Sequence, residues 1–268
     1  GWTLDPAHTN ALGASQYPVI WSNAAPRIGL FGDSFVQGTT ADDARLAVQL
    51  QTQIPAAQVL GYGVGGYGLD QIVLSLEAQL PTLLGGEAVV GVMLTDIDRS
   101  ILHYRDGPKP WFSFNAGVLD LHVEHLGSEA AEPQGPRSHF FGWIVHGAWP
   151  QLRSLLGRPR PDCSVVEKTA LTHALIDRAA ASCMAHQVRC TLLIFPHIEA
   201  FQTPHGWRME ALVQAAAESG MSLRDAGSIW SAADLQAADI YGPDRHPSPA
   251  ANAAIARALA QSLGNHPG

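Results

Sequence analysis

The chain has 268 residues, of which 46% are hydrophobic and 15% are charged, and its formal net charge is −8. A chain of this length is long enough to bury one large hydrophobic core. The acidic balance argues against a nucleic-acid partner, because nucleic acids bind basic surfaces. No uninterrupted apolar run is long enough to cross a bilayer, so we expect no stable membrane insertion by this chain.

Because the sequence begins with Gly1 and not with methionine, we expect a trimmed or mature form in which a removed signal or anchor is not visible. Residues 1–26 contain three prolines and little periodicity, which predicts an irregular N-terminal arm. We expect a single domain over residues 1–268, since no repeat or linker divides the chain.

Five apolar segments predict the strands of a sheet, and helical spacing predicts helices between and after them. The first strand includes Ile28, Leu30 and Phe31 and ends in Gly32-Asp33-Ser34, and the others cover residues 57–60, 88–94, 189–195 and 221–225. The helices are predicted over residues 42–53, 69–84, 165–187, 205–219 and 249–263, with an irregular stretch after residue 225. This alternation predicts an α/β fold with a parallel sheet and helical crossovers.

Residues 100–164 interrupt the alternation and predict an insertion, or lid, over the carboxyl edge of the sheet. We expect a short hairpin and a helix over residues 138–157 in it. Its aromatic residues either line a substrate groove or pin the insertion to the body of the domain. Its histidines lack the i, i+4 spacing of a helical zinc pair, so we expect no metal site from His103, His122, His125, His139 and His146.

The second predicted strand leads into a glycine-rich segment, residues 61–68. Gly61, Gly63 and Gly66 satisfy the G-x-G-x-x-G pattern of dinucleotide sites, but that fingerprint follows the first strand of its sheet, not the second. The other interpretation is a turn whose backbone passes close to another segment, such as the Ser34 turn. We therefore expect no dinucleotide at this segment.

Ser34 follows the first strand at the edge where open α/β sheets bind ligands. A serine hydroxyl becomes an effective nucleophile when a base removes its proton and a third group orients that base. Asp244 and His246 lie in the loop before the last predicted helix, and this loop opens on the same edge of a doubly wound sheet. The alternative for both residues is a capping role at that helix.

Four segments in this order resemble the four blocks of the SGNH (GDSL-type) hydrolases: Gly32-Asp33-Ser34, Gly65-Gly66, Thr95-Asp96 and Asp244-x-His246-Pro247-Ser248. The resemblance spans nearly the whole chain. GDSFVQG, which begins at Gly32, and GYGVGGYGLDQ, which begins at Gly61, look like the segments of a bacterial branch often found beside polysaccharide acylation systems. It implies a flavodoxin-like, three-layer α/β/α sandwich around a five-stranded parallel sheet, with no metal or organic cofactor. It also favours a periplasmic or secreted location, and the residues do not exclude the cytoplasm.

By this resemblance Ser34 is the nucleophile and, through its backbone N–H, the first donor of the oxyanion hole. Gly66 supplies a second N–H, His246 is the general base, and Asp244 orients it. Thr95 stands where the family has an asparagine that donates to the oxyanion. The loss of one such donor typically costs about 10²–10³ in turnover. We expect the neighbouring Asp96 to face away from the oxyanion.

The spacing of the acid is a second departure, because many members of the family have the aspartate three residues before the histidine. Pro243 holds that place here, and Asp244 is two residues before His246. If Asp244 does not reach the imidazole, a backbone carbonyl has to orient it, and Asp239 is only a distant substitute.

The sequence thus predicts a serine esterase that cleaves an O-acyl ester, in particular an O-acetyl group on a carbohydrate, through an acyl-enzyme. Three alternatives stay open: an O-acyltransferase that uses the same triad, a lysophospholipase or thioesterase, and a weakly active carbohydrate-binding domain. The expected partner is a small-molecule or carbohydrate ester.

Overall fold

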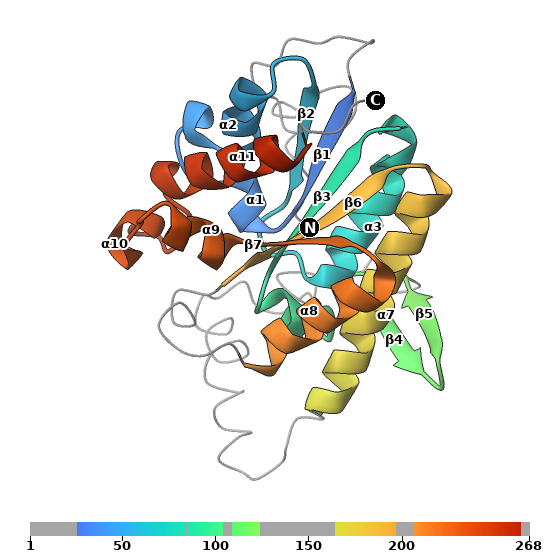
Figure 1. The fold of residues 1–268 in the computed structure, drawn as a ribbon. Coiled ribbons are helices and arrows are strands. Elements are labelled where there is room, and N and C mark those ends of the chain that lie inside the picture. Colours follow the sequence, from blue (N-terminus) through green and yellow to red (C-terminus); the bar gives the residue numbers. More distant parts are fainter. Residues whose placement is uncertain (1–25, 84, 104–108, 124–163, 197–205, 264–268) are drawn as a thin grey trace, which may run out of the picture.

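The computed structural model describes residues 26–83, 85–103, 109–123, 164–196 and 206–263, and Figure 1 shows their arrangement. Five parallel strands form the central sheet, in the order β2-β1-β3-β6-β7. Their bounds are Arg27–Gly32 (β1), Gln58–Gly63 (β2), Glu87–Met93 (β3), Arg189–Phe195 (β6) and Ser222–Asp225 (β7). The predicted five-stranded parallel sheet is confirmed, and its order is that of flavodoxin-like folds.

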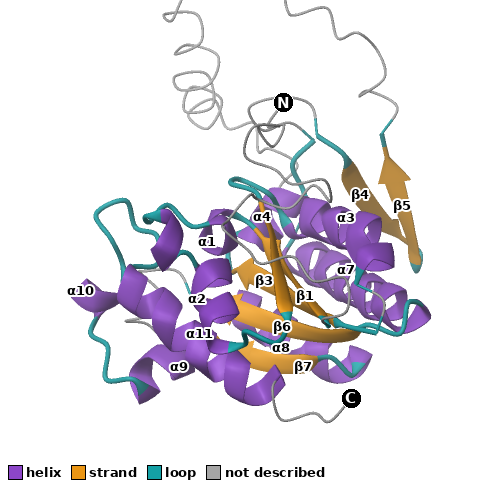
Figure 2. Cartoon of the chain, turned by 90° about the horizontal axis from the view of Figure 1, so that it is seen from above, coloured by secondary structure: helices purple, strands orange, loops and turns teal. Residues whose placement is uncertain are grey.

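Helices cover both faces of the sheet, as Figure 2 shows. One layer contains α2 (Leu46–Gln53), α9 (Ala226–Ala232) and α11 (Pro249–Leu263). The other layer contains α3 (Leu69–Gln79), α7 (Val165–Ala185) and α8 (Trp207–Ser219).

The alternation of side chains along each strand divides the hydrophobic core in two. In β3, Val89 and Met93 pack into the cluster that contains the first helix layer, whereas Val90 and Val92 pack into the cluster that contains the second. Successive strand residues point to opposite faces, so a strand that is apolar throughout needs a helix layer on each side. The predicted three-layer α/β/α sandwich is therefore confirmed.

Several segments differ from the prediction. The helix expected over residues 42–53 is broken: residues 42–44 form a 3-10 turn, and α2 begins only at Leu46. The stretch expected to be irregular holds α9 and a further short helix, α10 (Ala237–Ile240). Asp225 caps α9 by accepting hydrogen bonds from the backbone N–H groups of Gly227 and Ser228 at 3.0 and 3.1 Å. Helices this short show too few turns for their periodicity to stand out.

The described part of the insertion contains an antiparallel hairpin of β4 (Trp111–Asn115) and β5 (Val118–His122). The hairpin packs on α7 and α3 (Figure 2). Most of the predicted insertion lies outside the described residues, so its position over the carboxyl edge of the sheet stays a prediction. Phe112 is buried in the core, and the Arg178 guanidinium lies 5.1 Å from the centre of its ring. Phe112 thus pins the hairpin to the body. The helix expected over residues 138–157 and the arm up to residue 25 lie outside the described residues.

A buried ion pair fastens the start of this hairpin to α3. Lys109 Nζ donates to Asp70 Oδ2, and neither side chain is more than 4% exposed. The Asp70 backbone N–H also donates to Ser100 Oγ at 3.3 Å, at the end of α4 (Asp96–Ser100). Burial raises the pKa of Asp70 to about 6, although the positive charge of Lys109 opposes this shift. Asp70 therefore joins the hairpin, α3 and α4 through one carboxylate and one amide.

We expect Lys109→Met to lower the free energy of unfolding by about 3–5 kcal/mol at pH 8, because it leaves a buried carboxylate without its lysine partner. The loss should be smaller at pH 5. An acid whose pKa is raised by folding favours the folded state when protonated, and this contribution is lost as the pH rises through about 6.

Urea unfolding at both pH values measures the two losses. Lys168→Met is the matched control, because Lys168 pairs with Asp98, which Arg208 also binds. It should cost about 1 kcal/mol or less at either pH. A Lys109→Met loss that is the same at pH 5 and pH 8 would contradict the assignment of the effect to the charge of Asp70.

Candidate active site

Ser34 lies where β1 ends and a short helix, α1 (Ser34–Gln37), begins. Asp33 is the N-cap of this helix, and its Oδ1 accepts a hydrogen bond from the Phe35 N–H at 2.8 Å. The first amides of a helix have no carbonyl partner within the helix. Among the described residues, the Ser34 N–H has no hydrogen-bond partner. This N–H is therefore free to donate to a bound group.

His246 comes from the loop between α10 and α11. This loop is closed on itself: Tyr241 and Pro247 form an isolated β-bridge, and the Gly242 N–H donates to the His246 carbonyl at 2.8 Å. The imidazole Nε2 lies 2.9 Å from Ser34 Oγ, although 212 positions separate the two residues. The loop thus brings together the two residues that the sequence proposed as nucleophile and base.

Two acceptors of one residue face the other imidazole nitrogen. His246 Nδ1 lies 3.1 Å from the backbone carbonyl of Asp244 and 3.3 Å from its carboxylate Oδ2. A proton on Nδ1 satisfies this side of the ring and leaves Nε2 as the acceptor toward Ser34. A hydrogen bond from the Thr39 side chain lowers the pKa of Asp244; desolvation opposes this shift, and the His246 backbone N–H and imidazole charge add to it. Asp244 therefore reaches the imidazole despite its short spacing, and its own carbonyl lies nearer.

The sequence left open a capping role for His246 at the last helix, and in the structure another residue caps that helix. Ser248 performs the capping, because its Oγ accepts a hydrogen bond from the Ala251 N–H at 3.2 Å in the first turn of α11. Asp239, the distant substitute for Asp244, uses its carboxylate at the start of α10, where it accepts from the Gln236 N–H at 3.1 Å.

The glycine-rich turn after β2 passes beside the Ser34 turn. The Gly65 N–H donates to Gln37 Oε1 at 2.9 Å, and a Cβ atom added to Gly65 would lie 3.7 Å from the Cβ of Ser34. Gly66 has a φ of 85°, a backbone conformation that favours glycine. Gly61 and Gly63 lie inside β2, where they make no phosphate-binding turn. The close-approach interpretation therefore fits this segment.

Thr95 is the N-cap residue of α4 at the carboxyl end of β3, which is the neighbour of β1 in the sheet. Its side chain makes no capping hydrogen bond. The next residue, Asp96, is fully buried, and its Oδ2 accepts from the Met93 N–H at 2.9 Å. The Asp96 carboxylate is thus engaged inside the protein, and the role of Thr95 toward an oxyanion stays a prediction.

Two residues near Ser34 were not predicted from the sequence: Gln37, described above, and Arg99. The Arg99 Nη1 lies 2.7 Å from Asp33 Oδ2 and 2.6 Å from Asp96 Oδ1. An arginine three residues after Asp96 predicts the local ion pair at helical spacing. No sequence pattern predicts the pair with Asp33, because 66 positions separate the two residues.

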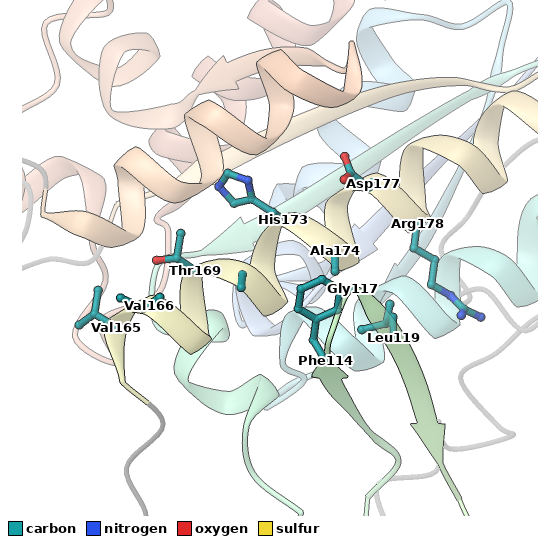
Figure 3. A pocket seen from close by; sticks show the side chains of 11 residues that line it. Phe114, Gly117, Leu119, Val165, Val166, Thr169, His173, Ala174, Asp177 and Arg178 are labelled. Atoms are coloured by element: carbon teal, nitrogen blue, oxygen red, sulfur yellow. The ribbon is translucent and has the colours of Figure 1, made fainter.

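A hollow of about 740 Å³ lies in another part of the molecule, between the hairpin and α7 (Figure 3). Its lining is mostly apolar and includes Phe114, Leu119, Val165, Val166 and Ala174. Neither Ser34 nor His246 lines it, so it does not belong to the site described above. Within the described ranges, no three His, Cys, Asp or Glu side chains gather in a way that suits a metal ion, and no helix is long and apolar enough to span a membrane.

No protein-family model matches the sequence, and no curated protein matches it. Solved structures do match. LAE5, an alpha/beta hydrolase enzyme from the metagenome of Lake Arreo in Spain, aligns with a TM-score of 0.55 at 13% identity, over 90% of this chain and 96% of that one. A member of the lipolytic protein G-D-S-L family from Veillonella parvula aligns with a TM-score of 0.52 at 13% identity, over 90% and 99%.

An acetylxylan esterase from Geobacillus stearothermophilus, Axe2, aligns in the form of a catalytic mutant with a TM-score of 0.51 at 12% identity, over 90% of this chain and 95% of that one. At such identities the likeness shows a shared fold. The chain therefore shares the α/β fold of these solved structures, as the sequence resemblance implied.

We expect Gly63→Ala to lower the free energy of unfolding by about 1–3 kcal/mol, the usual cost of overpacking. The added Cβ would lie 2.3 Å from the backbone N of Gln37, so the helix that begins with Ser34 has to shift. Urea unfolding measures the loss. Gly206→Ala is the control, because no atom lies within 4 Å of its Cβ position. Equal unfolding midpoints for wild type and Gly63→Ala would contradict this close contact.

Proposed function

We propose that this protein is a serine esterase that hydrolyses an O-acyl ester through an acyl-enzyme on Ser34. The observation that carries the proposal is the 2.9 Å contact between Ser34 Oγ and His246 Nε2, with Asp244 on the other side of the imidazole. The fold shared with a solved alpha/beta hydrolase enzyme and a solved acetylxylan esterase supports the same reaction class, although a fold alone hosts many functions.

In the proposed reaction, Ser34 Oγ attacks the ester carbonyl carbon while His246 Nε2 takes the hydroxyl proton. The backbone carbonyl and the carboxylate of Asp244 hold Nδ1–H and stabilise the imidazolium. His246 then gives the proton to the leaving alcohol. A water molecule, deprotonated by the same nitrogen, then attacks the acyl carbon. The bond from this carbon to Ser34 Oγ breaks, Oγ takes the proton back from His246, and the acid is released.

The negative charge on the carbonyl oxygen needs donors that are already in place. We assign this role to the backbone N–H groups of Ser34 and Gly66 and to the hydroxyl of Thr95. The first N–H is free among the described residues, and the Gly65-Gly66 turn runs beside Ser34. Thr95 ends the neighbouring strand but carries a shorter donor than the asparagine of the family. The proposed hole is therefore weaker on that side.

For the substrate we propose an O-acetyl group on a carbohydrate. The support is the sequence resemblance to the branch linked to polysaccharide acylation, together with the shared fold of a protein described as an acetylxylan esterase. The same acyl-enzyme transfers its acyl group to a sugar if a hydroxyl takes the place of water. Addition of sugar acceptors to the assay, with product analysis by mass spectrometry, separates hydrolysis from transfer.

Ser34→Ala should abolish the release of p-nitrophenol from p-nitrophenyl acetate, with a loss of at least about 10³-fold in kcat, because the nucleophile is gone. Ser182→Ala is the control. The Ser182 hydroxyl on α7 donates to Glu77 on α3, away from the candidate site, so its loss should leave the rate unchanged. Equal release by wild type and Ser34→Ala, with acetyl and octanoyl esters alike, would contradict the proposal.

Asp244→Asn should lower kcat/KM by about 10–10²-fold, less than the roughly 10⁴-fold loss seen where the carboxylate alone sets the tautomer of the histidine. The reason is the Asp244 backbone carbonyl, which lies 3.1 Å from Nδ1 and is kept in the variant. The same ester assay measures this loss. A drop in kcat/KM of about 10⁴-fold or more would instead show that the carboxylate alone orients the base.

A further inference from the structure

One guanidinium group lies where three segments of the candidate site meet. Arg99 Nη1 lies 2.7 Å from Asp33 Oδ2, 2.6 Å from Asp96 Oδ1 and 3.3 Å from the backbone carbonyl of Tyr67. The Arg99 side chain is 18% exposed, whereas the two carboxylates are at most 1% exposed. The Arg99 guanidinium thus pairs with two buried carboxylates, and buried carboxylates are costly without such partners.

Each of these three acceptors belongs to a segment that carries a proposed catalytic group. Asp33 also accepts from the Phe35 N–H, so its carboxylate holds the first turn of the helix that begins with Ser34. Tyr67 directly follows Gly66 in the glycine-rich turn. Asp96 directly follows Thr95, and its other oxygen accepts from the Met93 N–H of β3. Arg99 therefore contacts all three segments from which the oxyanion donors are drawn.

These contacts matter because the donors have to be placed to within about 0.5 Å of the productive geometry. The three segments come from different strand ends, and the hydrogen bonds of the sheet stop before them. The guanidinium is planar and always charged, so its hydrogen bonds have fixed directions that an ammonium group on a flexible stem does not reproduce.

We propose that Arg99 is a positioning residue that sets the distance between the backbone N–H groups of Ser34 and Gly66. It acts through the Asp33 carboxylate and the Tyr67 carbonyl and does not itself touch the substrate. This inference rests on the proposed esterase function. It goes further by assigning the geometry of the oxyanion hole to one arginine outside the family's four blocks.

A purely structural role for Arg99 predicts a different result from a positioning role. If the arginine only neutralises two carboxylates, its replacement lowers the amount of folded protein, and every folded molecule still reacts at the wild-type rate. If it sets the donor geometry, each folded molecule forms the acyl-enzyme more slowly. The rate per active site distinguishes the two, because it does not depend on how much protein is folded.

The experiment compares wild type, Arg99→Lys and the control Arg178→Lys. Arg178 also binds a carboxylate, with its Nε and Nη2 at 2.8 and 3.0 Å from Glu77, but between the outer helices α7 and α3. Active sites are titrated to completion with a fluorophosphonate. The acylation rate is then taken from the burst phase with p-nitrophenyl acetate and divided by the titrated sites.

We expect Arg99→Lys to lower the acylation rate per site by about 10–10²-fold, up to the loss of one oxyanion donor. Arg178→Lys should react at the wild-type rate. Addition of guanidinium chloride at non-denaturing concentration should restore part of the rate per site in Arg99→Ala. Arg99→Lys keeps the charge and carries the test by itself if Arg99→Ala does not fold.

A wild-type acylation rate per site in Arg99→Lys would overturn the positioning role, whether or not fewer sites are titrated. The proposed esterase function would stand in that case, because the sites still react. If wild type forms no fluorophosphonate adduct and no burst, the proposed function fails, and this inference fails with it. The two failures are therefore distinguishable in one set of measurements.

Discussion

The parallel direction of all five strands is the constraint on which the rest of the structure depends. Since parallel strands end at the same edge of a sheet, β1, β2 and β3 deliver Ser34, the Gly65-Gly66 turn and Thr95 to one place. The first strand lies between the other two, so both turns flank the serine. The loop before α11 closes the set by placing His246 Nε2 2.9 Å from Ser34 Oγ. Residues that are 212 positions apart in the chain thus meet at one edge of the sheet.

Buried carboxylates near this edge form ion pairs with nearby cationic side chains. Arg99 pairs with Asp33 and Asp96, and Lys109 pairs with Asp70. Burial of such groups is favourable only when partners and hydrogen bonds compensate for the lost water. Both clusters also connect segments that follow different strands. The charges therefore contribute to the definition of loop geometry where the hydrogen-bond ladder of the sheet no longer acts.

The loop that carries the histidine shows how a short spacing is accommodated. Arg245, between Asp244 and His246, adopts a φ of 65°, which bends the chain tightly. As a result, one residue offers the imidazole both its carbonyl and its carboxylate. From the sequence, we expected either the Asp244 carboxylate or a backbone carbonyl to orient the imidazole. In the folded loop both groups of Asp244 face His246 Nδ1.

The sequence by itself determined the sheet, the two helix layers and the edge that carries Ser34. Apolar runs, helical spacing and glycine turns are local signals, and the direction of parallel strands follows from the helices between them. It did not reveal α9 or α10, which are too short for periodicity to show. Only the tertiary structure decided that Arg99 binds Asp33, that Gln37 holds Gly65, and that the hairpin packs on α7 and α3. These contacts join residues far apart in the chain, and their geometry depends on side-chain packing that no local pattern encodes.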